Sequence, residues 1–361
     1  GFLSLIVPFM GFTYYSIVAG WAVKYVWFSV AGVFSGIGGE ESGALFATTA
    51  VSGASNIFFQ GLVIAATALV VGLGVRRGIE AATKIMMPAL LLILVLMAGY
   101  NIFNGGLAEA ARFLFVPDWP AVKGITVLYA LGQAFFSIGV GVGFMITYGA
   151  YLPKDVSIPR AAAAIAGLDT LVSLLAGLAI FPIVFAAGLN PSEGPGLTFV
   201  TLPVAFGGMS FGQVLAALFF ILLIFAAFTS TIGMLEPLVC HFEERVKAPR
   251  IALAFGLALA VFAVGVLPSL SWGALADARP LAFVPALAEK TVFETFDFIT
   301  ASILIPGNAF LIAAFAGWIV VTRHFREELD LGSASFTLWR VLVKYAAPLA
   351  VLAITLFGLM G

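Results

Sequence analysis

The chain has 361 residues, of which 62% are hydrophobic and only 10% are charged, and its mean hydropathy is +1.13. A soluble domain carries about a quarter charged residues, so the composition excludes a soluble globular protein and indicates a helical protein with many membrane spans. The net charge of −1 gives no basis for binding nucleic acid. The single cysteine, Cys240, excludes an internal disulfide and argues against a cysteine-based metal site.

Hydropathy predicts about nine spans and one membrane domain over residues 1–361. The spans are expected near 1–30, 56–75, 81–103, 124–151, 158–188, 209–240, 250–268, 292–320 and 337–360. The segment 189–206, which contains Pro191, Pro195 and Pro203, is expected to form a re-entrant or capping hairpin on the outer side.

Positive charge falls in every second connection between these spans. The basic connections carry Arg76, Arg77 and Lys84, then Lys154 and Arg160, then Arg245, Lys247 and Arg250, and finally Arg323, Arg326 and Arg340. By contrast, 31–55 has Glu40 and Glu41 but no Lys or Arg, and 189–208 has only Glu193. Because basic loops stay in the cytoplasm, the pattern predicts a multi-pass protein of the inner (plasma) membrane whose first span begins on the cytoplasmic side.

The stretch "GQAFFSIGVGVGF" interrupts the fourth predicted span with Gly139, Gly141 and Gly143. An interior glycine weakens a helix by about 1 kcal/mol relative to alanine. Non-helical backbone at membrane depth is tolerated only where it is buried in protein or lines a cavity, as in transporters with broken helices. Small residues also allow close packing of membrane helices, and the spacing alone leaves both interpretations open.

Several polar residues deep in other spans favour a transport site. Asp169 lies well inside the fifth span, where a carboxylate is costly and is usually paired or ion-bound. Tyr14 and Tyr15 lie in mid-span rather than at a membrane surface, so each phenol needs a polar partner. Asp297 begins the eighth span, where a solvated acid at a helix start is the simpler explanation.

A cluster of oxygen atoms is predicted in "FAAFTSTIGM" of the sixth span. Thr229 and Ser230 supply two hydroxyls within one turn, and Ala226 supplies a carbonyl one turn earlier. Such hard oxygen ligands suit an alkali cation. Serine and threonine hydroxyls in membrane helices also bond back to the preceding turn, so this motif by itself leaves the choice open.

Together these stretches resemble the neurotransmitter:sodium symporter family in its bacterial amino-acid branch. The resemblance is carried by "GQAFFSIGVGVGFMITYGAYLPKD", "FTYYSIVAGW", "LDTLVSLLAGLAIF", "GLTFVTLP", "FAAFTSTIGMLEP", "FDFITASI" and "FLFVPDW". It implies an all-α inverted-repeat transporter with an unwound helix. The spans would be family helices three to eleven, so an N-terminally incomplete chain without helices one and two is expected. Residues 1–103 would be the remainder of the first repeat, 124–320 the second repeat, and 337–361 an additional helix.

The resemblance implies a role for each matching residue. Tyr15 would bind the substrate carboxylate, Phe136 would be the outer lid, and Ser137 would use its hydroxyl and carbonyl on the first sodium ion. Ala226, Thr229 and Ser230 would form half of the second sodium site. Asp297 would sit with Phe136 at the outer gate, and Gln133 near both that gate and the chloride region.

Departures from the family pattern refine the prediction. Asp169 stands where many members have an asparagine ligand of the first sodium, and Ser173 stands where chloride-dependent members have a chloride-binding serine. The resemblance implies two sodium ions. A fixed carboxylate beside sodium would replace the chloride charge, so we predict no chloride requirement.

The expected pocket walls also depart from the family. Gly11 and Gly139 replace larger residues, Val142 replaces a common phenylalanine, and Met234 adds a flexible wall. The substrate set is therefore Tyr15, Gly11, Phe136, Ser137, Gly139, Val142, Ser230 and Met234. Added room favours a bulky hydrophobic or aromatic amino acid such as Trp, Tyr or Leu, unless a neighbouring side chain fills the space.

The sequence thus predicts a sodium-coupled symporter of a neutral amino acid that lies in the lipid bilayer. The protein could form a homodimer. A non-transporting amino-acid sensor on the same scaffold is the alternative. An enzyme is disfavoured because His241 and His324 have no carboxylate–metal arrangement around them. Glu236 is expected to face a cytoplasmic vestibule.

Overall fold

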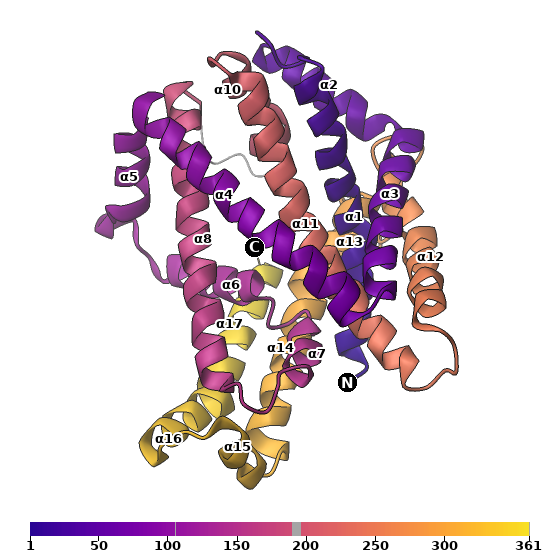
Figure 1. Ribbon diagram of the computed structural model, residues 1–361, viewed down its shortest axis with the longest axis vertical. Helices are drawn as coiled ribbons and strands as arrows, with labels where there is room; N and C mark the ends of the chain where they lie inside the picture. The colour runs from indigo at the N-terminus through magenta and orange to yellow at the C-terminus, as the bar shows by residue number, and fades with distance from the viewer. Residues whose placement is uncertain (105, 190–195, 361) are drawn as a thin grey trace.

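The structure is a computed structural model that describes residues 1–104, 106–189 and 196–360. Over these ranges every regular element is a helix (Figure 1). This follows from the composition, because a helix satisfies its backbone hydrogen bonds within one segment and can therefore cross hydrocarbon.

The helices of the first half follow one another with short connections. They are α1 (Leu3–Val30), α2 (Gly39–Val51), α3 (Gly53–Gly72), α4 (Glu80–Asn104), α5 (Leu107–Phe115), α6 (Gly124–Ile138), α7 (Phe144–Ala150) and α8 (Ile158–Ala186). A π-helical turn, Val75–Ile79, precedes α4, and a 3₁₀ turn, Trp119–Ala121, precedes α6.

The second half contains several π-helical turns within its helical stretches. The α-helices are α10 (Leu202–Gly207), α11 (Gly212–Glu243), α12 (Arg250–Ser269), α13 (Val292–Phe298), α14 (Ile305–Ala314), α15 (Thr322–Leu329), α16 (Ser333–Val341) and α17 (Ala347–Met360). The π-helical turns are Leu197–Thr201, Ile299–Leu304, Phe315–Ile319 and Leu342–Ala346, and Pro285–Leu287 is a 3₁₀ turn.

Eight helical stretches in the described residues are long and apolar enough to cross a membrane. They are Leu3–Val30, Gly53–Gly72, Val75–Phe103, Ile158–Ala186, Gly212–Glu243, Arg250–Ser269, Val292–Ile319 and Ser333–Leu356. The segment 124–151 is not a continuous helix, because it is divided into α6 and α7. The division occurs at the glycines that the sequence singled out.

The core is built around the long helices α1 and α11, which pack against each other. Tyr25 of α1 packs on Phe220 of α11, and Trp21 of α1 joins the same aromatic cluster through Phe199. The Tyr25 hydroxyl donates to the Phe199 carbonyl at 3.1 Å. Phe199 belongs to the predicted outer hairpin, so the described part of that segment inserts its side chains into the core.

Pro191, Glu193 and Pro195 of the predicted hairpin lie outside the described residues. Pro203 lies in α10, directly after the π-helical turn Leu197–Thr201. The described part of the predicted hairpin that follows Pro195 is helical.

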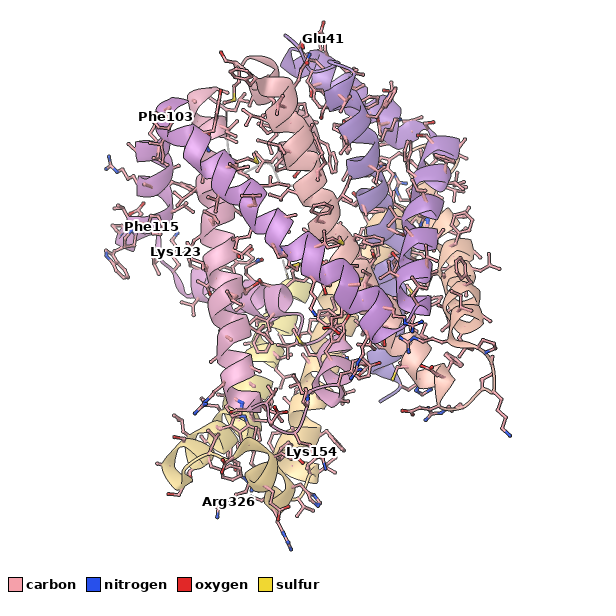
Figure 2. All side chains as sticks on the ribbon, in the orientation of Figure 1. Glu41, Phe103, Phe115, Lys123, Lys154 and Arg326 are labelled. Atoms are coloured by element: carbon pink, nitrogen blue, oxygen red, sulfur yellow. The ribbon has the colours of Figure 1, made fainter. Side chains whose placement is uncertain are left out.

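Charged residues of three predicted connections lie at the two ends of the bundle. Glu41 lies at one end, and Lys154 and Arg326 lie at the opposite end (Figure 2). The N-terminus lies toward the end that carries Lys154 and Arg326 (Figure 1). The arrangement is the one expected if alternate connections share a side of the membrane.

Candidate functional site

The glycines between α6 and α7 are required by the backbone and by its neighbours. Gly139 has φ +71° and Gly143 has φ +98°, in the left-handed region that favours glycine. At Gly141, a β-carbon would lie 2.3 Å from the carbonyl oxygen of Ile305, which no side chain can accommodate. The motif therefore produces both effects that the sequence left open: an unwound backbone and a close approach to another helix.

A buried asparagine satisfies the unwound backbone. Asn308 of α14 is 1% exposed, and its Nδ2 donates to the carbonyl of Gly141 at 2.9 Å. Its Oδ1 accepts from the Ser4 hydroxyl of α1 at 3.0 Å. Asn308 thus ties the break to α1 and α14. Sequence reasoning missed it, although a lone amide in the apolar run "ILIPGNAFLIAAF" is the signal that could have found it.

Asp169 and Ser137 come together across α8 and α6. The Ser137 hydroxyl donates toward both carboxylate oxygens of Asp169, at 2.6 and 2.7 Å. Ser137 is in the last turn of α6, where unpaired carbonyls give the helix end a partial negative charge. A carboxylate and a helix C-terminus together form an electronegative site in which a cation is stabilised.

The hydroxyls of α11 form the compact oxygen cluster that the sequence predicted. Thr229 Oγ1 donates to the carbonyls of Phe225 and Ala226, both at 3.0 Å, and Ser230 Oγ donates to the Ala226 carbonyl at 3.1 Å. These are the hydrogen bonds to the preceding turn that serine and threonine hydroxyls commonly make in membrane helices. A hydroxyl that donates its proton still carries lone pairs, so back-bonding leaves both oxygen atoms able to ligate a cation.

The adjacent tyrosines of α1 have different partners. The Tyr15 phenol lies close to the Ser230 side chain and therefore beside the α11 cluster. The Tyr14 hydroxyl lies close to the Asp297 carboxylate, and its ring packs edge-to-face on Phe293, with ring centroids 5.6 Å apart. The predicted outer-gate acid therefore has a partner on α1, a pairing that sequence reasoning missed.

The pocket walls are partly filled in this structure. A β-carbon at Gly11 would lie 3.6 Å from the Met234 sulfur, an ordinary van der Waals contact. A β-carbon at Gly139 would lie 2.4 Å from the Phe144 ring, so that ring occupies the space that the glycine leaves. Val142 is buried at 7% exposure. The room expected at Gly139 is therefore taken up by a neighbouring side chain.

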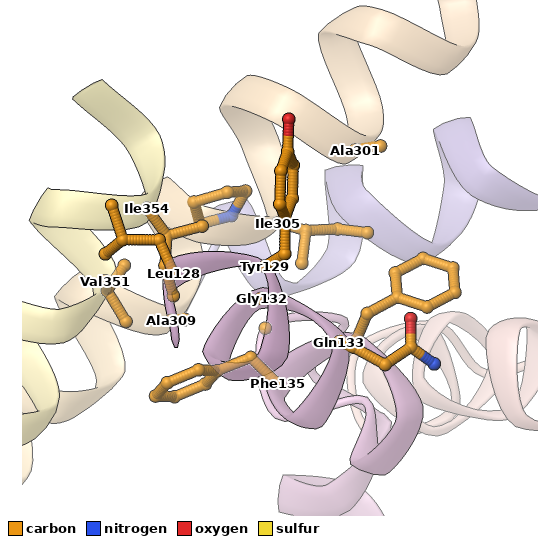
Figure 3. Close-up of a pocket in the computed structure, with 13 residues that line it drawn as sticks. Leu128, Tyr129, Gly132, Gln133, Phe135, Ala301, Ile305, Ala309, Val351 and Ile354 are labelled. Atoms are coloured by element: carbon orange, nitrogen blue, oxygen red, sulfur yellow. The ribbon is translucent and has the colours of Figure 1, made fainter. Parts of the chain in front are cut away.

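Phe136 and Gln133 border a groove on another side of α6. This groove, of about 320 Å³, is lined mainly by apolar residues of α6, the stretch 299–314 and α17 (Figure 3). Phe136 is 57% exposed. Ser173 is exposed on α8, and among the described residues its side chain makes no hydrogen bond with Gln133. The structure thus brings Ser137 to Asp169 but does not join the two predicted chloride-region residues.

The prediction for Glu236 is wrong. Its side chain is 0% exposed, so it does not face a water-filled vestibule. Its carboxylate accepts from the Tyr151 hydroxyl at 2.5 Å and forms an ion pair with Arg250. Arg250 also donates to Glu243 at 2.5 Å and to the Val71 carbonyl at 3.0 Å. Four segments, α3, α11, the start of α12 and the end of α7, therefore meet at this ion pair.

In the ranges that the structure describes, no group of three or more His, Cys, Asp and Glu residues is arranged to hold a metal ion. His241 lies beside Arg245, with 3.3 Å between Nδ1 and the guanidinium. The two oxygen sets described above consist of hydroxyls, one carboxylate and backbone carbonyls.

Comparison with known proteins identifies the fold and the family. The model of the Sodium:neurotransmitter symporter family matches residues 49–361. YhdH of Bacillus subtilis, an uncharacterized sodium-dependent transporter, is 35% identical over 360 residues, which are 99% of this chain and 78% of YhdH. A sodium-dependent transporter of Haemophilus influenzae is 28% identical over 365 residues, covering 99% of this chain and 78% of its own length.

The fold is similar to the crystal structure of MhsT in complex with L-phenylalanine. The TM-score is 0.87 at 36% identity, and the match covers 99% of this chain and 80% of MhsT. The relatives are sodium-dependent membrane transporters and not enzymes. The chain belongs to the sodium:neurotransmitter symporter family.

Proposed function

We propose that the protein couples an inward sodium gradient to the uptake of a neutral, hydrophobic amino acid by alternating access. The observation that carries this proposal is the Ser137–Asp169 pair, which places a carboxylate against the C-terminal end of a half-helix in the membrane domain. A carboxylate inside a membrane span is costly and is usually paired or ion-bound. Family membership makes sodium that cation, and transport is favoured over the sensor alternative because the relatives are transporters.

We propose two sodium ions, each held by its own set of oxygen ligands. Ser137 and Asp169 would contribute oxygen ligands to the first ion. Ala226, Thr229 and Ser230 would contribute to the second, using the lone pairs that their hydrogen bonds leave free. Both sets consist of hard oxygen atoms, which suit an alkali cation and not a soft transition metal.

The proposed substrate is a hydrophobic amino acid of large size. The solved relative MhsT binds L-phenylalanine in its crystal structure. In this chain Tyr15 would bind the substrate carboxylate, and Gly11, Phe136, Val142 and Met234 would surround its side chain. Gly11 lies next to Met234, a flexible side chain that can adapt to substrate side chains of different shape.

Chloride independence is proposed for the same site. The Asp169 carboxylate supplies next to Ser137 the fixed negative charge that chloride supplies in chloride-dependent members. Replacing it by a neutral amide would leave the first sodium without a compensating anion. The family model of an inverted repeat, with 1–103, 124–320 and 337–361 as its parts, would place both sodium sites at the repeat interface.

The experiment is uptake of radiolabelled leucine, phenylalanine and tryptophan by the complete protein in proteoliposomes, with sodium and chloride varied separately. We expect uptake to require sodium and to be unaffected by chloride. The Asp169→Asn variant should become chloride-dependent or lose transport. Sodium-independent uptake would contradict the proposed coupling, and chloride-insensitive transport by Asp169→Asn would contradict the role of Asp169.

A further inference from the structure

Phe144 is the first residue of α7, and its ring fills the space beside two glycines that belong to different segments. The tip of the ring reaches the break, because a β-carbon at Gly139 would lie 2.4 Å from its Cζ. The base of the ring reaches α11, because a β-carbon at Gly233 would lie 3.8 Å from its Cγ and Cδ1. The ring therefore spans the gap between the unwound backbone and α11.

These glycines lie among the residues of the proposed site. Gly139 comes two positions after Ser137, and Gly233 lies between Ser230 and Met234 on α11. Phe144 itself is half-buried, so the ring packs on both segments while part of it is not covered by the described chain. An aromatic face in this position is an apolar surface on which a hydrophobic side chain can pack.

We propose that Phe144 determines substrate specificity, because its ring sets the size of the compartment for the substrate side chain. This inference rests on the proposed function. Glycine at position 139 would enlarge the compartment only if nothing occupied the space, and the ring of Phe144 occupies it. The glycines at 139 and 233 accommodate the ring, and the ring forms the wall that the substrate meets.

The test measures substrate ranking when the ring is made smaller. Wild type, Phe144→Leu and Phe144→Ala are reconstituted in proteoliposomes, and alanine, leucine, phenylalanine and tryptophan compete with sodium-driven uptake of radiolabelled leucine. We expect Phe144→Ala to raise the preference for tryptophan over leucine by at least about tenfold, since a single methylene in a hydrophobic pocket changes discrimination by roughly 10–200-fold. Phe144→Leu should lie between this variant and wild type.

Ile146→Ala is the matched control, because Ile146 is also an apolar residue of α7 but is 54% exposed. Its ranking should equal that of wild type. An unchanged ranking in Phe144→Ala and Phe144→Leu, or an equal change in Ile146→Ala, would overturn the inference. If Phe144→Ala does not fold, Phe144→Leu and the similarly sized Phe144→Met are compared in the same way, with the same outcomes.

A thiol-labelling experiment distinguishes a wall of the site from a residue that only supports the fold. Cys240 is the single cysteine, so a Phe144→Cys variant that also carries Cys240→Ala has one thiol, at position 144, for labelling. Saturating leucine should slow its reaction with a small thiol reagent at least about threefold, whereas an unaffected rate would contradict direct contact. Failure of wild type to take up any amino acid with sodium would refute the proposed function. Sodium-driven uptake with an unchanged ranking would refute only the role of Phe144.

Discussion

The ion pair between Arg250 and Glu236 gives the most direct test of the structure. Arg250→Ala would leave the Glu236 carboxylate, which is 0% exposed, without its counter-charge. Removing one partner of a buried ion pair costs about 3–5 kcal/mol. The protein can relieve this cost by unfolding or by moving α7 and α12 away from α11, which would let water reach Glu236.

Both responses can be measured, and the chain contains its own reporter. Cys240 lies one turn after Glu236 on α11, beside Tyr151, and is half-buried. A loss of about 3 kcal/mol would raise the open fraction by about a hundredfold, at 1.4 kcal/mol for each factor of ten. We therefore expect Arg250→Ala to lower the temperature of thermal inactivation in detergent and to increase the rate of Cys240 labelling by a thiol reagent.

A control and a double variant make this test specific. Arg245→Ala removes a neighbouring arginine whose side chain is 57% exposed and whose pairing with Glu244 is worth about 0–1 kcal/mol, so it should behave as wild type. The double variant Arg250→Met with Glu236→Leu removes both charges and should recover most of the lost stability. The reasoning would be refuted if Arg250→Ala neither destabilised the protein nor exposed Cys240, or if the double variant were no better than the single one.

Two further predictions concern the break and the outer end of the bundle. Asn308→Ala should lower thermal stability by about 1–3 kcal/mol for each buried group left unpaired, because it removes the partner of the Gly141 carbonyl and that of the Ser4 hydroxyl. A wild-type melting temperature for Asn308→Ala would contradict the assignment. Tyr14→Phe keeps the aromatic packing but removes the hydroxyl that lies close to Asp297, so bound radiolabelled leucine should dissociate up to about tenfold faster, which corresponds to 1.4 kcal/mol. An unchanged dissociation rate would show that the contact between Tyr14 and Asp297 does not retain the substrate.

The class of protein and the position of the break follow from local properties of the sequence. Composition and the length of the apolar runs are enough to indicate membrane helices, because each helix satisfies its own backbone hydrogen bonds. The glycines at 139 and 143 are needed for left-handed backbone, a requirement of the residue itself. The back-bonding of Thr229 and Ser230 is equally local, since it joins residues within one turn.

The tertiary structure alone determined which side chains meet across segments that are far apart in the sequence. Gly141 and Asn308 are 167 residues apart, and only the packing of α14 against the break brings them together. Hydropathy placed Glu236 near the end of a span but could not show that Arg250 would neutralise it there. Likewise, the sequence predicts extra room in the pocket at Gly139, but α7 places the Phe144 ring in that space. A hydrophobic pattern indicates which environment each helix prefers, lipid, water or protein. Whether a charge is buried or a void is filled depends on which helices pack against each other.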